Sequence, residues 1–401
     1  MPADSIVASV AMPALLPIYT RSDLYFERGD GCFLFDDKGR RYLDFVAGAA
    51  VAAFGHAHPI LTKALSDQAQ RLWIASNLYK SHRLEQLAQR LVDLSFADTL
   101  FLQNSGVEAW ELGIKIIRKY FSSIGQPQRY RVISFEGCFH GRSLAAIAAS
   151  KTHKMVDGFG PMTEGFDQVG WDDLPAVRAA ITPETAAIMI EPVQGEGGMR
   201  VASSQFLQGL RKLCEEFGLL LYFDEIQCGL GRTGKMFAYE WADVAPDVMC
   251  IAKALGNGFP IGACLATSRA AQGMTAGTHG STYGANPLGV AVAHAVLDLL
   301  TAPGFLDEIE GKGRYLEVKL AEVVRKHPEV FSEQRGIGLM RALRCIPPSA
   351  EIIVALQQAG LLTIAGGDNV VRLLPPLIVT TAQIDEAAAV IDRVAERFSR
   401  A

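Results

Sequence analysis

The sequence predicts an α/β protein with a large domain built on a mostly parallel sheet and a smaller α+β domain. Between residues 57 and 300, short apolar runs rich in branched side chains alternate with apolar positions at helical spacing. Such runs are typical of parallel strands covered on both faces. After residue 300 a long charged helix precedes short strand-like pieces, and 49% apolar content over 401 residues is ample for a sizeable core.

The large domain is expected at residues 57–300, where helices and strands follow one another. Helical stripes are expected at residues 84–92, 110–117 and 206–217. Strands are expected at residues 99–103, 131–135, 186–190, 218–223 and 247–252.

The small domain is expected at residues 301–401, packed with an N-terminal segment at residues 1–56. It should contain a helix at about 305–326 and strands around GIGLMRALR, LLTIA and VVRLLPP. A closing helix should begin at a capping box formed by Thr380 and Gln383. The strand-like stretch GCFLFDDKGRRYLDF suggests that the N-terminal segment adds strands to this domain.

The charge and cysteine content narrow the ligand class and the compartment. A net charge of −5 without a long basic run argues against nucleic acid or an anionic membrane as partner, so a small molecule is expected. Asp4 precedes the first basic residue, Arg21, which fits neither a secretory nor a transit peptide. Seven cysteines without CxxC spacing favour a reducing, cytoplasmic setting.

Lys253 and Asp224 are the strongest candidates for chemistry, because ligands of open parallel sheets bind at the carboxyl ends of the strands. Lys253 follows an apolar run, where desolvation would lower its pKa and make its amine a Schiff-base nucleophile. Asp224 ends a neighbouring strand and could keep a pyridinium nitrogen protonated. The plainer alternatives are a lysine extending from a strand end and a carboxylate in a helix cap or ion pair.

Two further features fit a phosphorylated ring. Free backbone N–H groups at the start of a helix could bind a phosphate at Ser105, Gly106 and Val107, although such turns are common. Phe139 could stack on a ring, although a lone aromatic residue is more often part of a core.

Two competing motifs are weaker. Gly229-x-Gly231-x-x-Gly234 has dinucleotide-binding spacing, but no helical period follows it and the next strand ends in lysine. These glycines are therefore expected to form a flexible loop near the edge of the site. His56 and His58 have no third ligand nearby, so a structural turn is expected and no metal.

Together and in this order, FHGR, EPVQGEGG, FDEIQCGLGRTG, AKALGNGFPIG and GSTYGANP resemble the acetylornithine aminotransferase family, among the class III pyridoxal-phosphate (PLP) aminotransferases. The resemblance extends from DKGRRYLDF to RLLPPLIV, almost the whole chain. It implies the type I fold of PLP-dependent transferases, PLP as cofactor, and a homodimer with the active site at the subunit interface.

The resemblance also implies roles for the residues around the cofactor ring. Lys253 would hold PLP covalently and move the proton, and Asp224 would pair with the ring nitrogen. Phe139 and Ile226 would enclose the ring, and Gln227 would hydrogen-bond its hydroxyl group.

The phosphate and the substrates have implied partners as well. Backbone groups of residues 105–107 would bind the phosphate, together with Thr282 of the partner subunit. Arg142 would bind the α-carboxylate of acetylornithine and the side-chain carboxylate of glutamate. Arg372 would bind the α-carboxylate of glutamate, and Glu196 would neutralise Arg372 when the other substrate is bound.

The implied reaction moves the terminal amino group of N2-acetyl-L-ornithine to 2-oxoglutarate, a step of arginine biosynthesis. Succinylornithine, succinyl-diaminopimelate, ornithine or 4-aminobutyrate could be the donor instead. An aminomutase or racemase would share the scaffold, but the pairing of Arg372 with Glu196 serves a second substrate and argues against both.

The chain departs from the family pattern at several positions. SGVEAWE stands in place of SGTEANE, so Val107 lacks a hydroxyl group for the phosphate, although the backbone donors remain. Asn257 and Ala285 stand where glycine is usual, and Asn257 lies close to the lysine. The stretch AGAAVAAFGH has small side chains near residue 49, which would leave room for an acyl group.

Overall fold

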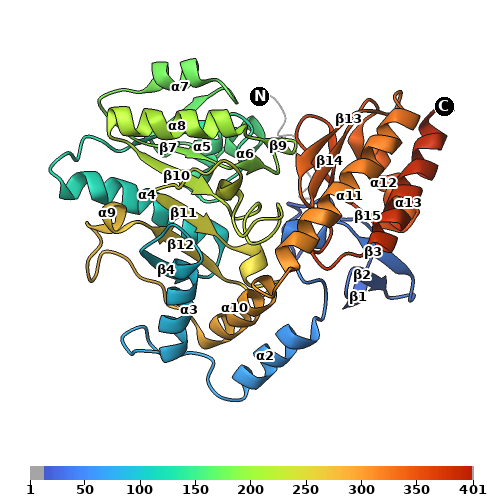
Figure 1. Ribbon diagram of the computed structural model, residues 1–401, viewed down its shortest axis with the longest axis horizontal. Helices are drawn as coiled ribbons and strands as arrows, with labels where there is room; N and C mark the ends of the chain where they lie inside the picture. Colours follow the sequence, from blue (N-terminus) through green and yellow to red (C-terminus); the bar gives the residue numbers. More distant parts are fainter. Residues whose placement is uncertain (1–12, 400–401) are drawn as a thin grey trace, which may run out of the picture.

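A twisted seven-stranded sheet forms the larger part of the computed structural model, which describes residues 13–399 (Figure 1). Asp4, on which the argument against a leader peptide partly depends, is among residues 1–12, which lie outside the described residues. In spatial order the strands are β4 (Thr99–Gln103), β12 (Gly262–Ala266), β11 (Val248–Ile251), β10 (Leu220–Asp224), β7 (Thr185–Ile190), β5 (Arg131–Phe135) and β6 (Phe166–Val169).

The sheet is parallel except for β12, which pairs antiparallel with both β11 and β4. Side chains of β10 alternate between two apolar layers. Leu221 and Phe223 belong to one layer, and Leu220 and Tyr222 belong to the other. Both faces of the strand are thus buried, which explains its uninterrupted apolar sequence.

Helices cover both faces of this sheet. The layer on one face includes α4 (Gly106–Ser123), α5 (Leu144–Ser150) and α9 (Ser268–Ala271). The other layer includes α2 (Pro59–Ala69), α3 (His82–Asp93), α7 (Leu174–Ala180), α8 (Ser204–Phe217) and α10 (Pro287–Leu300). The short helix α6 (His153–Val156) and the two-stranded sheet of β8 (Val193–Gln194) and β9 (Arg200–Val201) lie in the connections.

Segments from both ends of the chain meet beside the large sheet, where Figure 1 shows blue strands next to red helices. β1 (Phe26–Asp30), β2 (Phe33–Asp36) and β3 (Arg41–Asp44) continue into β15 (Leu361–Leu362), which pairs in parallel with β3. A second sheet contains β13 (Phe331–Ile337), β14 (Met340–Cys345), β17 (Val370–Leu373) and β16 (Ile364–Gly366). The helices are α11 (Phe305–Lys326), α12 (Ser349–Gln358) and α13 (Thr381–Ser399).

Several local expectations are confirmed. β5 and α11 have the predicted bounds. The capping box at the start of α13 is present: the N–H of Thr380 donates to Oε1 of Gln383 at 2.9 Å, and the N–H of Gln383 donates to Oγ1 of Thr380 at 3.2 Å. Within residues 13–399 no single helix meets the length and apolarity needed to cross a bilayer; α10 and α11 do so only as a pair bent by 72°.

The glycine loop after β10 is buried and fixed, contrary to the expected flexible loop. It runs through turns to the 3-10 helix η1 (Ala238–Trp241), so no helix follows the glycines as a dinucleotide site requires. The guanidinium of Arg232, which is 1% exposed, donates to the carbonyls of Leu339 and Pro375 at 3.1 and 2.5 Å. These bonds connect the loop to the residue before β14 and to the segment after β17.

Candidate active site

A cavity of about 310 Å³ opens at the carboxyl ends of β4, β5, β7, β10 and β11. Polar side chains that follow different strands converge there, as expected for an open parallel sheet. Its lining includes the predicted residues Ser105, Gly106, Val107, Phe139, Glu196, Asp224, Ile226, Gln227 and Lys253.

Lys253 begins a 3-10 turn, η2 (Lys253–Leu255), directly after β11. Its φ of 39° is a left-handed conformation that costs a non-glycine residue about 1–2 kcal/mol, a strain typical of functional sites. Burial lowers the pKa of its amine to about 8, while the carboxylates of Glu196 and Asp224 partly oppose this shift. The predicted desolvation is confirmed, and the amine is partly neutral near physiological pH.

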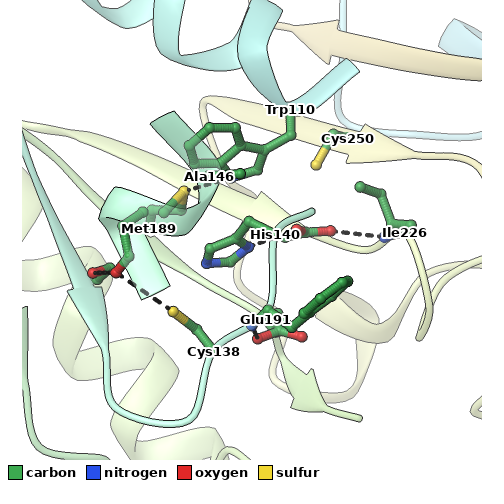
Figure 2. Close-up of polar contacts among 12 residues, drawn as sticks. Trp110, Cys138, His140, Ala146, Met189, Glu191, Ile226 and Cys250 are labelled. Carbon is green, nitrogen blue, oxygen red and sulfur yellow. Dashed lines mark hydrogen bonds and ion pairs between the residues drawn. The ribbon is translucent and has the colours of Figure 1, made fainter. Parts of the chain in front are cut away.

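Asp224 lies at the end of β10 with 3% of its surface exposed. Its Oδ1 accepts a hydrogen bond from the N–H of Ile226 at 3.0 Å, and its Oδ2 lies 2.7 Å from Nδ1 of His140 (Figure 2). Burial lowers the pKa of His140, but Cys138 and the Asp224 carboxylate raise it well above its ordinary value. No role for His140 was predicted, although its place in the loop that follows β5 is the signal that could have found it.

The N-terminus of α4 faces the cavity. Ser105 caps the helix, its Oγ accepting from the N–H of Glu108 at 3.3 Å. Ala109 is the first residue whose N–H reaches back along the helix, so the N–H groups of Gly106 and Val107 are left for a ligand. A Cβ on Gly106 would lie 3.0 Å from Cδ1 of Ile226, so a larger residue here would require the Ile226 side chain to shift.

Two other carboxyl and amide side chains complete the wall. Glu191 follows β7 and accepts from the N–H of Phe139 at 3.1 Å; burial raises its pKa to about 8. Glu191 directly follows a strand, which is a position typical of functional residues, but no role was predicted for it. Gln227 donates through Nε2 to the carbonyl of Ala49 at 3.3 Å, while its Oε1 is buried without a hydrogen-bond partner among residues 13–399.

Ala49 belongs to α1 (Ala47–Ala50), a single turn with left-handed backbone angles. This turn brings the N-terminal segment to the cavity, where Val51 lines the wall.

Three predicted residues lie outside the lining of the cavity. Arg372 is buried, and its Nη1 lies 2.7 Å from Oε1 of Glu196. This pair is close enough for an ion pair but is not aligned as a hydrogen bond. Arg142 is exposed, its guanidinium carbon 5.7 Å from the centroid of the Phe139 ring. Thr282 is exposed on a loop.

His56 takes part in a contact within the protein: its Nε2 lies 2.8 Å from Oδ2 of Asp44. Within residues 13–399 no group of three or more His, Cys, Asp or Glu side chains is placed to hold a metal ion.

Comparison with known proteins identifies the family of this chain. The sequence pattern of "Aminotransferase class-III" matches residues 18–395. The chain belongs to the class III aminotransferases. Acetylornithine aminotransferase 1 of Bradyrhizobium diazoefficiens is 53% identical over 394 residues, covering 98% of this chain and 97% of the relative.

Solved structures of the class share the fold. The ornithine aminotransferase of Toxoplasma gondii ME49 superimposes with a TM-score of 0.93 at 31% identity, over 96% of this chain and 93% of that one. The N-acetylornithine aminotransferase of Stenotrophomonas maltophilia K279a gives 0.83 at 36% identity, over 95% and 97%. A second structure of the Toxoplasma enzyme contains PLP at partial occupancy in its active site.

Class III aminotransferases are PLP-dependent enzymes, and the cavity fits this cofactor. A partly neutral lysine amine and a buried carboxylate line the same space, as PLP requires. The free N–H groups at the start of α4 suit its phosphate. The orphaned Oε1 of Gln227 suits a hydroxyl donor.

Proposed function

We propose that the enzyme transfers the terminal amino group of N2-acetyl-L-ornithine to 2-oxoglutarate, giving N-acetyl-L-glutamate 5-semialdehyde and L-glutamate in arginine biosynthesis. The observation that carries this proposal is the shared cavity of Lys253 and Asp224 at the end of the sheet. The relative at 53% identity, named acetylornithine aminotransferase, supports the choice of donor.

PLP supplies an electron sink for the carbon that loses a proton. Lys253 would hold the cofactor through Nζ, and the same Nζ would move that proton. Asp224 would pair with the ring nitrogen. Phe139 and Ile226 enclose the ring, and Gln227 binds its hydroxyl group.

The two substrates are distinguished by charge. Arg142, which is exposed, would bind the carboxylate distant from the reacting carbon in both substrates. Arg372 binds the α-carboxylate of glutamate, which lies beside the reacting carbon. When acetylornithine is bound, no carboxylate is present there, and Glu196 neutralises Arg372. The ion pair of 2.7 Å is the geometry needed for the acetylornithine state.

Ornithine is the second candidate donor, because the ornithine aminotransferase of Toxoplasma gondii has a TM-score of 0.93. Small side chains at Ala49 and Ala50, and Val51 in the lining, favour a substrate that carries an acyl group. The same space would admit succinylornithine, so a comparison of kcat/KM for the two donors is needed to identify the acyl group.

Half-reactions test the function. Purified holoenzyme is mixed with N-acetylornithine without an oxoacid, the semialdehyde is quantified, and 2-oxoglutarate is then added and glutamate measured. Lys253→Ala should abolish both steps, whereas Lys63→Ala on exposed α2 should change neither. A kcat/KM above that of N-acetylornithine for ornithine, succinylornithine, succinyl-diaminopimelate or 4-aminobutyrate would show that this compound is the donor instead. Amine migration or racemisation without any oxoacid would point to an aminomutase or racemase.

We also propose a homodimer with Thr282 of the partner subunit at the phosphate. Asn77 donates to the carbonyls of Ser281 and Gly284 at 2.8 and 3.2 Å, which holds the loop of Thr282 beside an apolar segment. Large apolar side chains are exposed on this surface at Leu72, Trp73, Ile74, Leu78, Tyr79 and Tyr283. An apolar surface of this kind is typical of a subunit interface.

Two further assignments accompany this proposal. The domain boundaries are placed near residues 57 and 300, with residues 1–56 packed on the C-terminal domain at 301–401; the pairing of β3 with β15 supports this division. The enzyme is assigned to the cytoplasm, because its seven cysteines lack the spacing of a disulfide framework.

A further inference from the structure

Trp110 lies flat against His140 in the core behind the cavity (Figure 2). Its side chain is fully buried, and the ring centroids are 5.5 Å apart with 13° between the planes. The indole Nε1–H donates to Sδ of Met189 at 3.0 Å, which fixes the rotation of the indole. The indole therefore presents its face, where the negative end of its quadrupole lies, to the imidazole.

His140 needs stabilisation from its surroundings if it carries a charge. Its Nδ1 bonds Asp224, but its Nε2 is buried and has no hydrogen-bond partner within residues 13–399. The titratable groups around the imidazole are the Asp224 carboxylate, the Glu191 carboxyl and the Cys138 thiol. The Asp224 carboxylate forms a charge-assisted hydrogen bond with Nδ1, and Cys138 also raises the pKa of His140. Further stabilisation of a buried imidazolium would come from the side chains packed against the ring.

An aromatic face packed against a buried cation stabilises the charge, and indole is the most effective of the aromatic side chains. The indole can affect the reaction only through His140, because it contacts His140 and does not line the cavity.

We propose that Trp110 is a positioning residue for the transamination: its indole face stabilises His140 as a cation and thereby holds the Asp224 carboxylate, which bonds to His140, in place for the ring nitrogen. This inference rests on the proposed function, in which Asp224 binds the ring nitrogen of PLP. Trp110 itself forms no bond to cofactor or substrate, so its effect appears first in the protonation of His140.

The test is an NMR titration of His140 in holoenzyme labelled with 13Cε1-histidine, the signal being assigned by its loss in His140→Gln. Trp110→Leu removes the aromatic face and keeps an apolar side chain, and Trp110→Phe keeps a weaker face. Phe166→Leu is the matched control. Phe166 stacks on Trp110 at 6.0 Å and 26°, so this variant removes an aromatic ring from the same core without removing the face on His140.

We expect Trp110→Leu to lower the titration midpoint of His140, with at least about a threefold change in the acid dissociation constant. Trp110→Phe should give a smaller change in the same direction, and Phe166→Leu none. The kcat of Trp110→Leu should fall by about three- to tenfold, with KM for the amine donor changed less.

An unchanged His140 midpoint in both Trp110 variants overturns the proposal, as does a His140 that stays charged across the whole pH range in Trp110→Leu. If Trp110→Leu does not fold, Trp110→Phe against Phe166→Leu decides the same question. The titration needs no turnover, so it separates the two proposals: an inactive protein with a shifted midpoint contradicts the proposed function alone.

Discussion

Nη1 of Arg372 lies 2.7 Å from Oε1 of Glu196, while Nε of the same arginine donates to the carbonyl of Ala365 at 2.9 Å. The backbone bond fixes the guanidinium, which is only 1% exposed, and the carboxylate neutralises it from the side of the cavity. A glutamate α-carboxylate must displace Glu196 to reach the arginine. This geometry supports the proposed role of the pair as a charge switch between the two substrates.

Glu196→Gln should separate the two half-reactions. Without its counter-charge Arg372 would bind 2-oxoglutarate more tightly, lowering its KM by about three- to tenfold, and would slow the reaction with acetylornithine by a similar factor. Single-turnover measurements of each half-reaction check this. Glu333→Gln, which removes the partner of Arg335 at 2.6 Å, is a matched control outside the cavity. Equal effects on both half-reactions would contradict the switch.

The reactivity of Lys253 should follow its lowered pKa of about 8. Below that pH the amine is protonated and unreactive, and above it the amine is free. The rate at which apoenzyme reattaches PLP should therefore rise by about tenfold between pH 7 and pH 9 and then level off. Stopped-flow absorbance measures this rate. A rate that still rises about eightfold between pH 9 and pH 10 would show that the lysine keeps its ordinary pKa.

The predictions of single helices and strands depended on local patterns in the sequence. The apolar run at residues 131–135 and the charged periodic stretch at 305–326 predicted a strand and a helix, and both match the structure. The antiparallel strand β12 was not predicted because its sequence GACLA has small side chains and little β-propensity. The left-handed turn at Ala47–Ala50 was not predictable either, because alanine rarely adopts positive φ.

Contacts at the site depend on topology, which a single sequence does not specify. His140 and Asp224 are 84 positions apart, yet β5 and β10 both border β7, so their carboxyl ends lie close together. The sequence places each residue after a strand, but the order of the strands decides which of them touch. The roles of Arg372 and Glu196 were available only through the family resemblance.

Asn257 should stabilise the entrance to the site by about 1 kcal/mol. Its Oδ1 accepts from the N–H of Phe54 at 2.6 Å, and its Nδ2 donates to the carbonyl of Gly55 at 3.1 Å. Asn257→Gly loses both bonds but relieves the left-handed backbone, whose φ is 44°. Asn257→Ala loses both bonds and keeps the strain, so it should cost about 2 kcal/mol. Denaturant unfolding measures both. A glycine variant as stable as the wild type would contradict a stabilising role for these two bonds.

Leu78 should be central to the proposed homodimer, because 89% of its surface is exposed in the isolated subunit. Leu78→Asp would place a charge in an apolar interface and should shift the protein to monomers in analytical ultracentrifugation. Affinity for PLP should fall with it, since Thr282 of the partner subunit would no longer reach the phosphate. Val354→Asp on α12 is the matched control, being 53% exposed in another part of the molecule. If Leu78→Asp remains dimeric and binds PLP as tightly as the control, this surface is not the interface and the assignment of Thr282 falls with it.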